Sequence, residues 1–410
     1  MTRRQHAITI LILGALSTIG PFSVDMYLPG FPAIAADLQT SIDRVQLSLT
    51  SYLIGMAAGQ LLYGPLLDRF GRKTPLSVGL TIYVLASLVC AFTNSINALI
   101  AMRLLQALGG CSGVVSAQAL VRDIFPVNKT AQAFSSLTLV IAISPMVAPT
   151  VGGYVTANFG WHYVFVILAS LTVLILGAVY FVLPQGRKAD ASLSLHPRIV
   201  LNNFYVVIRQ PQFLLYVLAG GIATSAPFAY IAGSSDVLIN LYGFTEQQYG
   251  WIFAFLAFAM IGTTQLNHIL LKKFTSQQII QVALLYQTGV GLLLLIGTWL
   301  DWYGPLSIIG LMFVFLTGQG LTNPNSTALS LAPFKRHIGS AASLNGCFRM
   351  AIGGLVTGLV SLLHNNTAMP MVGVMVLCVV TGLIVFTVGR KTIEYRASQR
   401  DVEEDISVLL

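Results

Sequence analysis

Charge is the scarcest property of this chain. Only 9% of its 410 residues are Asp, Glu, Lys or Arg, whereas 55% are hydrophobic and the mean hydropathy is +0.78. A soluble globular domain carries about 25% charged residues, so the composition excludes a soluble enzyme or binding domain. It is typical of a protein most of whose residues lie in a lipid bilayer.

The chain also lacks the clusters that mark redox, metal and nucleotide sites. Its four cysteines, Cys90, Cys111, Cys347 and Cys378, fall in apolar stretches, without zinc-ligand spacing or the exposed positions that suit disulfides. No Walker-type phosphate loop and no nucleophile–base pattern is present, and the six histidines are scattered. We therefore expect neither an enzyme nor a bound cofactor or metal.

Long apolar stretches make up most of the chain. A membrane-spanning helix needs about 20 mostly apolar residues, and twelve stretches meet this requirement. They lie near 7–29, 45–67, 75–93, 98–121, 131–155, 162–183, 213–235, 248–271, 277–299, 305–328, 338–363 and 371–389. The sequence therefore predicts an all-α membrane protein with 12 transmembrane helices.

The basic residues gather on one side of the predicted membrane. Outside the spans, all Lys and Arg except Arg44 lie in the N-terminal tail, the even-numbered connections or the C-terminal tail. Because cytoplasmic loops carry an excess of Lys and Arg, we expect both termini in the cytoplasm. The net charge of +8 is then a signal of orientation and gives no reason to expect nucleic acid as a partner.

The longest connection divides the chain in two. We predict an N-terminal six-helix half at 1–183, a cytoplasmic linker at 184–212, a C-terminal six-helix half at 213–390 and a solvated, mobile cytoplasmic tail at 391–410. A weak similarity between Leu66–Phe70 and Leu270–Phe274 supports two related halves. Transporters built from two such halves hold their substrate at the interface between them.

A charged turn follows the second predicted span. Residues 64–73 read Gly-Pro-Leu-Leu-Asp-Arg-Phe-Gly-Arg-Lys, with Gly55 nine residues earlier and Leu76 three residues later. Crossing a bilayer does not require such a turn. The pattern resembles the cytoplasmic loop signature of the major facilitator superfamily, Gly-x8-Gly-x3-Asp-Arg-x-Gly-Arg-Lys-x-x-Leu, at every fixed position. This resemblance implies the major facilitator fold and a transport function.

The same resemblance identifies a gating loop. Its predicted residues are Gly64, Asp68, Arg69, Gly71, Arg72 and Lys73, with Arg122 and Asp123 at the end of the fourth span. We expect an ion pair between Arg72 and Asp123 that holds the outward-open state and breaks on inward opening. The alternative is a pair of solvated loop charges, worth about 0–1 kcal/mol.

Asp25 is the one carboxylate well inside a predicted span. Placing a carboxylate near the bilayer centre costs at least about 2.5 kcal/mol, and such residues usually face the protein interior and have a function. Low dielectric disfavours the charged form, which suits a group that gains and loses a proton. The alternative is that Asp25 lies near the outer surface, because Pro29 and a loop follow closely.

The surroundings of Asp25 add a second resemblance. Asp25-Met26-Tyr27-Leu28-Pro29-x-x-Pro32 resembles the first-helix signature of the bicyclomycin/chloramphenicol-resistance (Bcr/CflA) family of drug:proton antiporters. In related multidrug antiporters, a first-helix acid at the matching place binds protons and cationic drugs. The resemblance therefore implies that Asp25 is a proton-coupling residue and part of the drug site.

Arg103 lies in the fourth predicted span, on one helical face with Gln106 and Gly110. A guanidinium stays charged at accessible pH and must find acceptors inside the protein. The pattern resembles the superfamily's fourth-helix motif, whose arginine is linked to proton transfer. We expect Arg103 to assist proton coupling without carrying the proton or pairing directly with Asp25. The alternative is a purely structural arginine that bonds helix carbonyls.

The fifth predicted span contains Pro145, Ala148, Pro149, Gly152 and Gly153. Prolines bend a helix, and paired glycines let another helix approach closely, although kinked membrane helices are common for structural reasons alone. The run resembles the antiporter motif Gly-Pro-x-x-Gly-Gly of the superfamily's exporters, with Ala148 in place of the first glycine. Trp161 and Phe165 downstream also fit the family's pattern. This resemblance favours export over uptake.

The second half offers further candidates for substrate binding. Arg349 stands where a neutral polar residue is expected. It is a counter-charge for an anionic or zwitterionic substrate, a partner for Asp25 across the cavity, or a structural arginine near the helix end. Aromatic walls with a few polar groups suit amphipathic ligands. The candidate substrate-binding residues are Asp25, Tyr27, Tyr52, Phe228, Tyr230, Asn323, Asn325, Asn345 and Arg349.

The predicted function is proton-coupled efflux of a small amphipathic drug or metabolite across the bacterial inner membrane, by alternating access. One charge moving down 100 mV supplies about 2.3 kcal/mol, so the proton gradient replaces a cofactor. The expected partners are the small molecule, protons and the lipid bilayer, with the protein acting as a monomer. Two alternatives remain: a proton-coupled metabolite importer, and a non-transporting receptor on the same fold.

Overall fold

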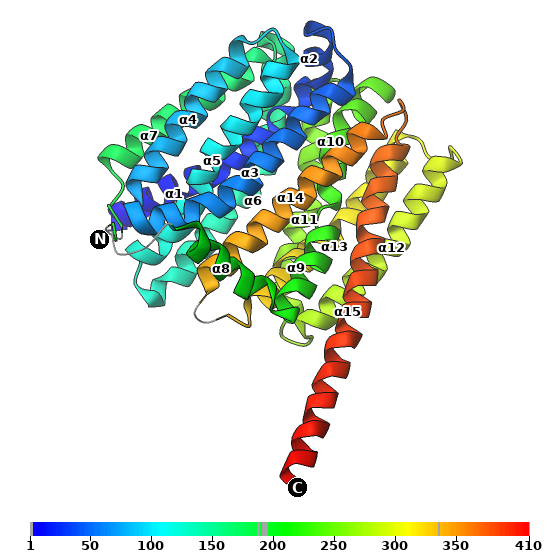
Figure 1. The fold of residues 1–410 in the computed structure, drawn as a ribbon. Coiled ribbons are helices and arrows are strands. Elements are labelled where there is room, and N and C mark those ends of the chain that lie inside the picture. Colours follow the sequence, from blue (N-terminus) through cyan, green and yellow to red (C-terminus); the bar gives the residue numbers. More distant parts are fainter. Residues whose placement is uncertain (1–2, 187–188, 191–195, 335–336, 410) are drawn as a thin grey trace.

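The structure is a computed structural model that describes residues 3–186, 189–190, 196–334 and 337–409. Parts of the predicted linker, residues 187–188 and 191–195, lie outside the described residues, as does Leu410 of the predicted tail. Figure 1 shows the described part as a bundle of long helices, with the end of the last helix projecting away from it.

Within the described residues, 12 helical segments are long and apolar enough to cross a membrane, which confirms the predicted number. They are Ala7–Asp37, Ile42–Phe70, Lys73–Phe92, Ile96–Ile124, Leu139–Phe159, His162–Phe181, Pro211–Leu241, Glu246–Leu270, Ser276–Trp299, Pro305–Leu331, Ile338–Leu362 and Met369–Thr392. Each overlaps the corresponding predicted stretch.

The first six spans comprise α1 (Arg3–Asp25), the 3-10 turn η1 (Leu28–Gly30), α2 (Phe31–Asp37), α3 (Ile42–Phe70), α4 (Lys73–Phe92), α5 (Ile96–Ile124), α6 (Val127–Phe159) and α7 (His162–Phe181). After α8 (Pro197–Ile208), the other six comprise α9 (Pro211–Ala223), α10 (Ala226–Ser235), the π-helical turn η2 (Asp236–Leu241), α11 (Glu246–Leu270), α12 (Ser276–Trp299), α13 (Pro305–Leu331), α14 (Ile338–Leu362) and α15 (Met369–Leu409).

Two spans are interrupted at corresponding places, the first and the seventh. Proline has no N–H to donate to the carbonyl four residues earlier. Pro29 therefore leaves the carbonyl of Asp25 without its helical partner, and α1 ends at Asp25. In the same way, Pro227 cannot bond to Ala223, and α9 ends at Ala223. Discontinuous membrane helices commonly form transport sites because their free backbone groups can bind ligands.

Two segments outside the spans are helical. The predicted linker contains α8, whose Phe204 and Val207 pack with Phe213, Val217 and Leu344 in a small apolar cluster. A period of three to four between Val200, Phe204 and Val207 is the signal from which this amphipathic helix could have been predicted. At the other end of the chain, α15 continues past its span to Leu409, so the backbone of the predicted tail is helical.

The two six-helix sets meet along two helix pairs, α3 with α14 and α6 with α11. Glycines allow both approaches: a side chain at Gly354 would meet Ile54, and one at Gly250 would lie 2.7 Å from the Cα of Thr150. We call the end of the bundle that carries the Asp68–Lys73 turn the basic end. At the opposite end, η1 packs on α10 and α11, and α2 packs on η2. No comparably extensive packing joins α5 to α13 among the described residues.

Candidate functional site

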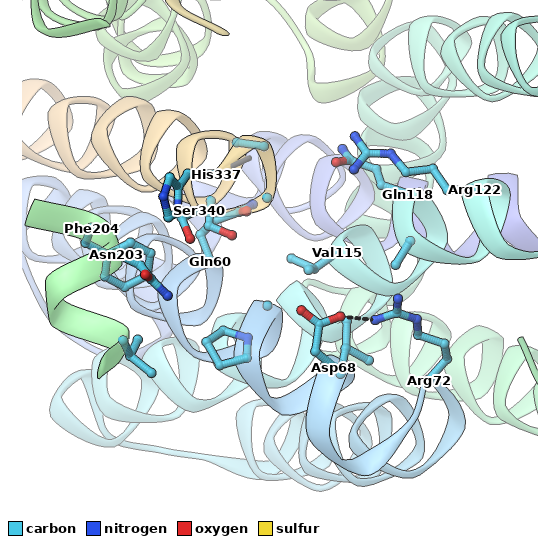
Figure 2. Close-up of a pocket in the computed structure, with 18 of the residues that line it drawn as sticks. Gln60, Asp68, Arg72, Val115, Gln118, Arg122, Asn203, Phe204, His337 and Ser340 are labelled. Carbon is cyan, nitrogen blue, oxygen red and sulfur yellow. Dashed lines mark hydrogen bonds and ion pairs between the residues drawn. The ribbon is translucent and has the colours of Figure 1, made fainter. Parts of the chain in front are cut away.

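A cavity of about 620 Å³ opens at the basic end. Both sets of helices line it, through α3, α5, α8 and the start of α14 (Figure 2). Its polar and charged lining residues are Gln60, Asp68, Arg72, Gln118, Arg122, Asp123, Asn203, His337, Ser340 and Ser343. Because the bundle is packed together at the opposite end, the molecule is open only toward the basic end in this region.

Five predicted gating residues line this cavity: Gly64, Asp68, Arg72, Arg122 and Asp123. Arg72 binds both acids, donating from Nε to Asp123 Oδ2 at 2.7 Å and from Nη1 to Asp68 Oδ1 at 2.8 Å. Burial alone would lower the pKa of the Arg72 guanidinium, but its hydrogen bonds to Asp123 and Asp68 outweigh burial and raise that pKa. Arg72 therefore stays charged, and the predicted pair with Asp123 is present.

The behaviour expected of this pair stays a prediction. The pair was expected to break when the protein opens inward, yet it is intact while the cavity is open at the basic end. Arg72 follows α3 and Asp123 lies in α5, so both belong to the same six-helix set. A rigid-body movement of one set against the other leaves the distance between them unchanged. Gly186 packs beside both residues and shields the pair.

The other three predicted gating residues do not line the cavity. Gly71 has a φ of 78°, a left-handed conformation that favours glycine, so it sets the turn between α3 and α4. Lys73 Nζ donates to the carbonyl of Tyr180 at 3.4 Å. The Arg69 guanidinium lies 5.9 Å from the centre of the Phe70 ring.

Asp25 is buried at the break in the first span, which continues to Asp37. The alternative that it lies at the outer surface is therefore not what the structure shows. Within the described residues its carboxylate makes no hydrogen bond or ion pair, although the oxygens keep some accessible surface. It lies in the same buried region as the phenols of Tyr52, Tyr230 and Tyr249. Because α10 and α11 carry two of these phenols, Asp25 faces the second set of helices.

Two of those phenols have unsatisfied hydroxyls. Within the part of the chain that the structure describes, the hydroxyl oxygens of Tyr52 and Tyr230 are buried without a hydrogen-bond partner, whereas Tyr249 bonds to Ser234 at 2.9 Å. A buried polar group without a partner costs about 1–3 kcal/mol and calls for an explanation. They share a buried region with the Asp25 carboxylate, so this region is a candidate binding site.

Arg103 is fully buried among three aromatic rings. Its guanidinium carbon lies 4.3 Å from the ring centre of Tyr52, 4.6 Å from that of Tyr27 and 5.7 Å from that of Phe165. It donates from Nη2 to the backbone carbonyl of Ser23 at 2.9 Å. Arg103 thus binds the end of α1 two residues before Asp25, and among the described residues it forms no ion pair with that acid.

A buried chain of hydrogen bonds holds Arg103 in place. Arg103 Nη1 donates to Gln106 Oε1 at 2.6 Å, and Gln106 Nε2 donates to Ser87 Oγ at 2.7 Å. On the other side, the hydroxyls of Tyr83 and Ser23 bond at 2.5 Å. The chain links α1, α4 and α5, and it fixes the guanidinium against the last turn of α1.

The two glycines of the predicted antiporter motif are contact points between helices. A side chain at Gly152 would overlap the carbonyl oxygen of Met26, directly after Asp25. A side chain at Gly153 would overlap the carbonyl oxygen of Glu246 at the start of α11. Ala148 and Pro149 are buried and Pro145 is partly buried within α6. The motif therefore places α6 between the break in the first span and the second set of helices.

The remaining candidate substrate residues fall into two groups. Those with satisfied polar groups are Tyr27, which bonds to Ser48 at 2.8 Å, Asn325, which bonds to Asn267 at 2.7 Å, and Asn345, which bonds to Ser330 at 2.6 Å. Those with groups left available among the described residues are Asn323, whose side chain makes no hydrogen bond there, and Arg349, with one bond to Thr327 at 3.2 Å. The ring of Phe228 packs against Gly353 of α14.

Sequence reasoning missed several residues that the structure brings together. Tyr249 lies near Asp25, and Tyr83 completes the bonding around Ser23. No local pattern distinguishes these tyrosines from the other 13 in the chain. Arg349 lies in the middle of α14, so the alternative of an arginine near the helix end is wrong.

Comparisons with known proteins agree with this architecture. The sequence profile of the Major Facilitator Superfamily matches residues 13–358. The chain is 35% identical over 385 residues to a bicyclomycin resistance protein homolog of Haemophilus influenzae, covering 94% of this chain and 96% of that protein. It is 28% identical over 380 residues to a chloramphenicol resistance protein of Pseudomonas aeruginosa, covering 90% and 88%. A crystal structure of a D-xylose–proton symporter has the same fold, with a TM-score of 0.74 at 14% identity over 93% of this chain and 97% of that one.

Proposed function

The chain belongs to the major facilitator superfamily, so it is a membrane transporter and not an enzyme, and we propose that it exports small amphipathic drugs or metabolites in exchange for protons. The observation that carries this proposal is Asp25, an unpartnered carboxylate at the break of the first span, facing the second set of helices. The names of the two relatives described above support drugs as the substrate class. We place the protein in the bacterial inner membrane with both termini in the cytoplasm, on the basis of its basic loops.

In the proposed cycle, the carboxylate of Asp25 binds either a proton or the substrate, but not both at once. With the cavity at the basic end open to the cytoplasm, Asp25 releases its proton and the substrate enters from that end. After reorientation, a proton from outside neutralises Asp25, which weakens substrate binding and releases the substrate. Moving one proton charge inward across 100 mV contributes about 2.3 kcal/mol to this exchange.

Arg103 is proposed to act through α1 and not as a proton carrier. It binds the carbonyl of Ser23, so it fixes the helix end on which Asp25 sits. A guanidinium does not titrate in the accessible range. The proposal of export instead of uptake rests on the motif at Gly152 and Gly153, which packs α6 against Met26 beside Asp25.

A susceptibility panel tests this proposal. An efflux-deficient bacterial strain would express the wild type or Asp25→Asn, with equal membrane levels checked by blotting, and be exposed to chloramphenicol and norfloxacin across a range of pH. We expect the wild type to raise resistance to at least one compound and Asp25→Asn to lose that resistance. Equal export by the mutant at every pH would overturn the assignment of the proton to Asp25.

Reconstituted vesicles separate the proposal from its alternatives. A vesicle with a trapped pH dye should show proton movement opposite to the movement of the exported compound. Movement of both in the same direction would indicate the importer. Retained ligand binding with no flux of either would indicate the receptor.

A further inference from the structure

Arg349 carries a partly buried positive charge for which the described residues supply no counter-charge. It lies in the middle of α14, and among the described residues it has no ion-pair partner. Of its five N–H donors, one bonds to the hydroxyl of Thr327 at 3.2 Å, and the others keep accessible surface. A charge that is partly withdrawn from water and has no counter-ion within the described residues favours a ligand that supplies one.

The register of α14 directs Arg349 toward the interface between the two sets of helices. Residues three and four apart share a helical face, so Arg349 lies on one face with Gly346 and Gly353. Gly346 contacts Gln60 of α3, which also lines the cavity at the basic end, and Gly353 contacts Phe228 of α10. Arg349 therefore lies between that cavity and the break in the seventh span.

Arg349 and Asp25 lie at different depths. Tyr52 shares the buried region of Asp25. The next residue in α3, Leu53, packs against Gly354 of α14, so Gly354 marks the level of Tyr52 on α14. Arg349 comes five residues before Gly354. At a rise of 1.5 Å per residue, Arg349 is therefore about 7.5 Å nearer the basic end than Gly354. Thr327 of α13 is the residue that bonds to Arg349. Asn323 lies one turn earlier on the same face of α13 and so farther from the basic end. Its amide, which is unbonded among the described residues, therefore lies on the side of Arg349 that is nearer to Asp25. The interface thus presents an acid and a base at separate levels, with polar side chains between them.

From this arrangement we propose that the transporter's substrates are zwitterions, with an anionic group held by Arg349 and a cationic group held by Asp25. Such a molecule supplies both missing counter-charges at once and bridges the two sets of helices. Protonation of Asp25 removes only the contact with the cationic group, while Arg349 keeps its charge throughout. This inference rests on the proposed function, because it deepens the assignment of the interface as the substrate site.

Norfloxacin and two derivatives provide a direct test. Norfloxacin carries a carboxylate and a piperazinium at opposite ends of a fused ring and is fluorescent. Its ethyl ester lacks the anion, and its N-acetyl derivative lacks the cation. Dissociation constants would be measured by ligand fluorescence on the purified full-length protein at one fixed pH. We expect norfloxacin to bind the wild type about tenfold or more tightly than either derivative, because each removes one charged contact.

Variants at two positions assign the anion contact. In Arg349→Gln, norfloxacin and its ester should bind with nearly equal affinity, while norfloxacin still binds more tightly than the N-acetyl derivative. Arg349→Lys should retain part of the difference between norfloxacin and the ester. Thr327→Val removes the one protein partner of Arg349 and is the matched control, which should leave that difference unchanged. If Thr327→Val reproduces the loss, Arg349 acts through packing and the proposal is overturned.

The wild type alone can also overturn the proposal. Equal affinity for norfloxacin and its ester, or no norfloxacin binding, would do so even if Arg349→Gln fails to fold. The binding assay needs no proton gradient, so its outcome is independent of the vesicle experiment. Charge-selective binding without proton flux would reject proton-coupled export and keep the zwitterion assignment. Proton-coupled export without charge selectivity would do the reverse.

Discussion

The guanidinium of Arg103 donates a hydrogen bond of 2.9 Å to the backbone carbonyl of Ser23, across the boundary between α5 and α1. The last carbonyls of a helix have no hydrogen-bond partner within the helix. Pro29 has no N–H to donate, so it cannot supply a partner for the carbonyl of Asp25. Arg103 therefore supplies a fixed cap for the helix end that carries Asp25. Its ring contacts with Tyr27 and Tyr52 prevent it from leaving that place.

This arrangement predicts that Arg103→Lys fails as a conservative replacement. A lysine keeps the charge but cannot bond to both Gln106 and Ser23 in the planar geometry of a guanidinium. We expect a loss of unfolding free energy of about 1.5–3 kcal/mol, the value of a hydrogen bond to a charged group, and loss of proton-coupled transport. Thermal unfolding of the purified protein and vesicle flux measure the two effects.

The control for Arg103 is the same substitution at Arg44, an exposed residue that bonds to Asn97 at the opposite end. Arg44→Lys should leave both stability and flux within error of the wild type. Arg103→Lys with normal flux would show that the bond to Ser23 is dispensable.

Gly152 gives a second prediction. A methyl group there overlaps the carbonyl oxygen of Met26, so Gly152→Ala must push α6 away from the break beside Asp25. We expect destabilisation of about 1–3 kcal/mol, typical of overpacking, and reduced export. Gly177→Ala is the matched control, because nothing lies within 4 Å of the added methyl in α7. The comparison fails if both alanine variants have the same melting temperature.

The ion pair of Arg72 and Asp123 gives a third prediction. Neutralising either residue alone should cost about 1 kcal/mol, the upper end of the range for solvent-exposed pairs, because both residues line the open cavity. Exchanging the two charges should restore stability only in part, because Asp68 lies 2.8 Å from Arg72 and would face an acid at position 72. Adding Asp68→Asn to the exchanged pair should improve the rescue. The melting temperatures of the five proteins test this, and full rescue with Asp68 present would contradict the geometry.

Two tyrosine hydroxyls allow a fourth prediction. Tyr52→Phe removes a buried hydroxyl that has no partner, so stability should stay equal or rise slightly, while substrate affinity falls if the substrate supplies that partner. Tyr27→Phe removes a hydroxyl bonded to Ser48 at 2.8 Å and should cost about 1 kcal/mol. Thermal unfolding and norfloxacin binding separate the two cases. Unchanged affinity in Tyr52→Phe would place that hydroxyl outside the binding site.

The number and positions of the membrane spans could be predicted from the sequence because residues that lie in lipid are mostly apolar. A span needs about 20 mostly apolar residues wherever it sits in the bundle, so each of the 12 spans could be recognised before any packing was known. Glycine at position 71 and the charges of its turn were equally visible, since a left-handed backbone and a water-facing loop are local requirements.

Distances between helices were decided only by the tertiary structure. Hydropathy does not tell which polar side chain meets which, so it could not show that Asn325 and Asn345 are satisfied within the second set of helices while Arg349 keeps free donors. It could not show that Arg72 and Asp123 lie 2.7 Å apart within one set of helices, because hydropathy does not tell which helices pack together. The sequence determined that Asp25 is an acid within a membrane span, and the fold determined that it has no partner among the described residues and faces the second set of helices.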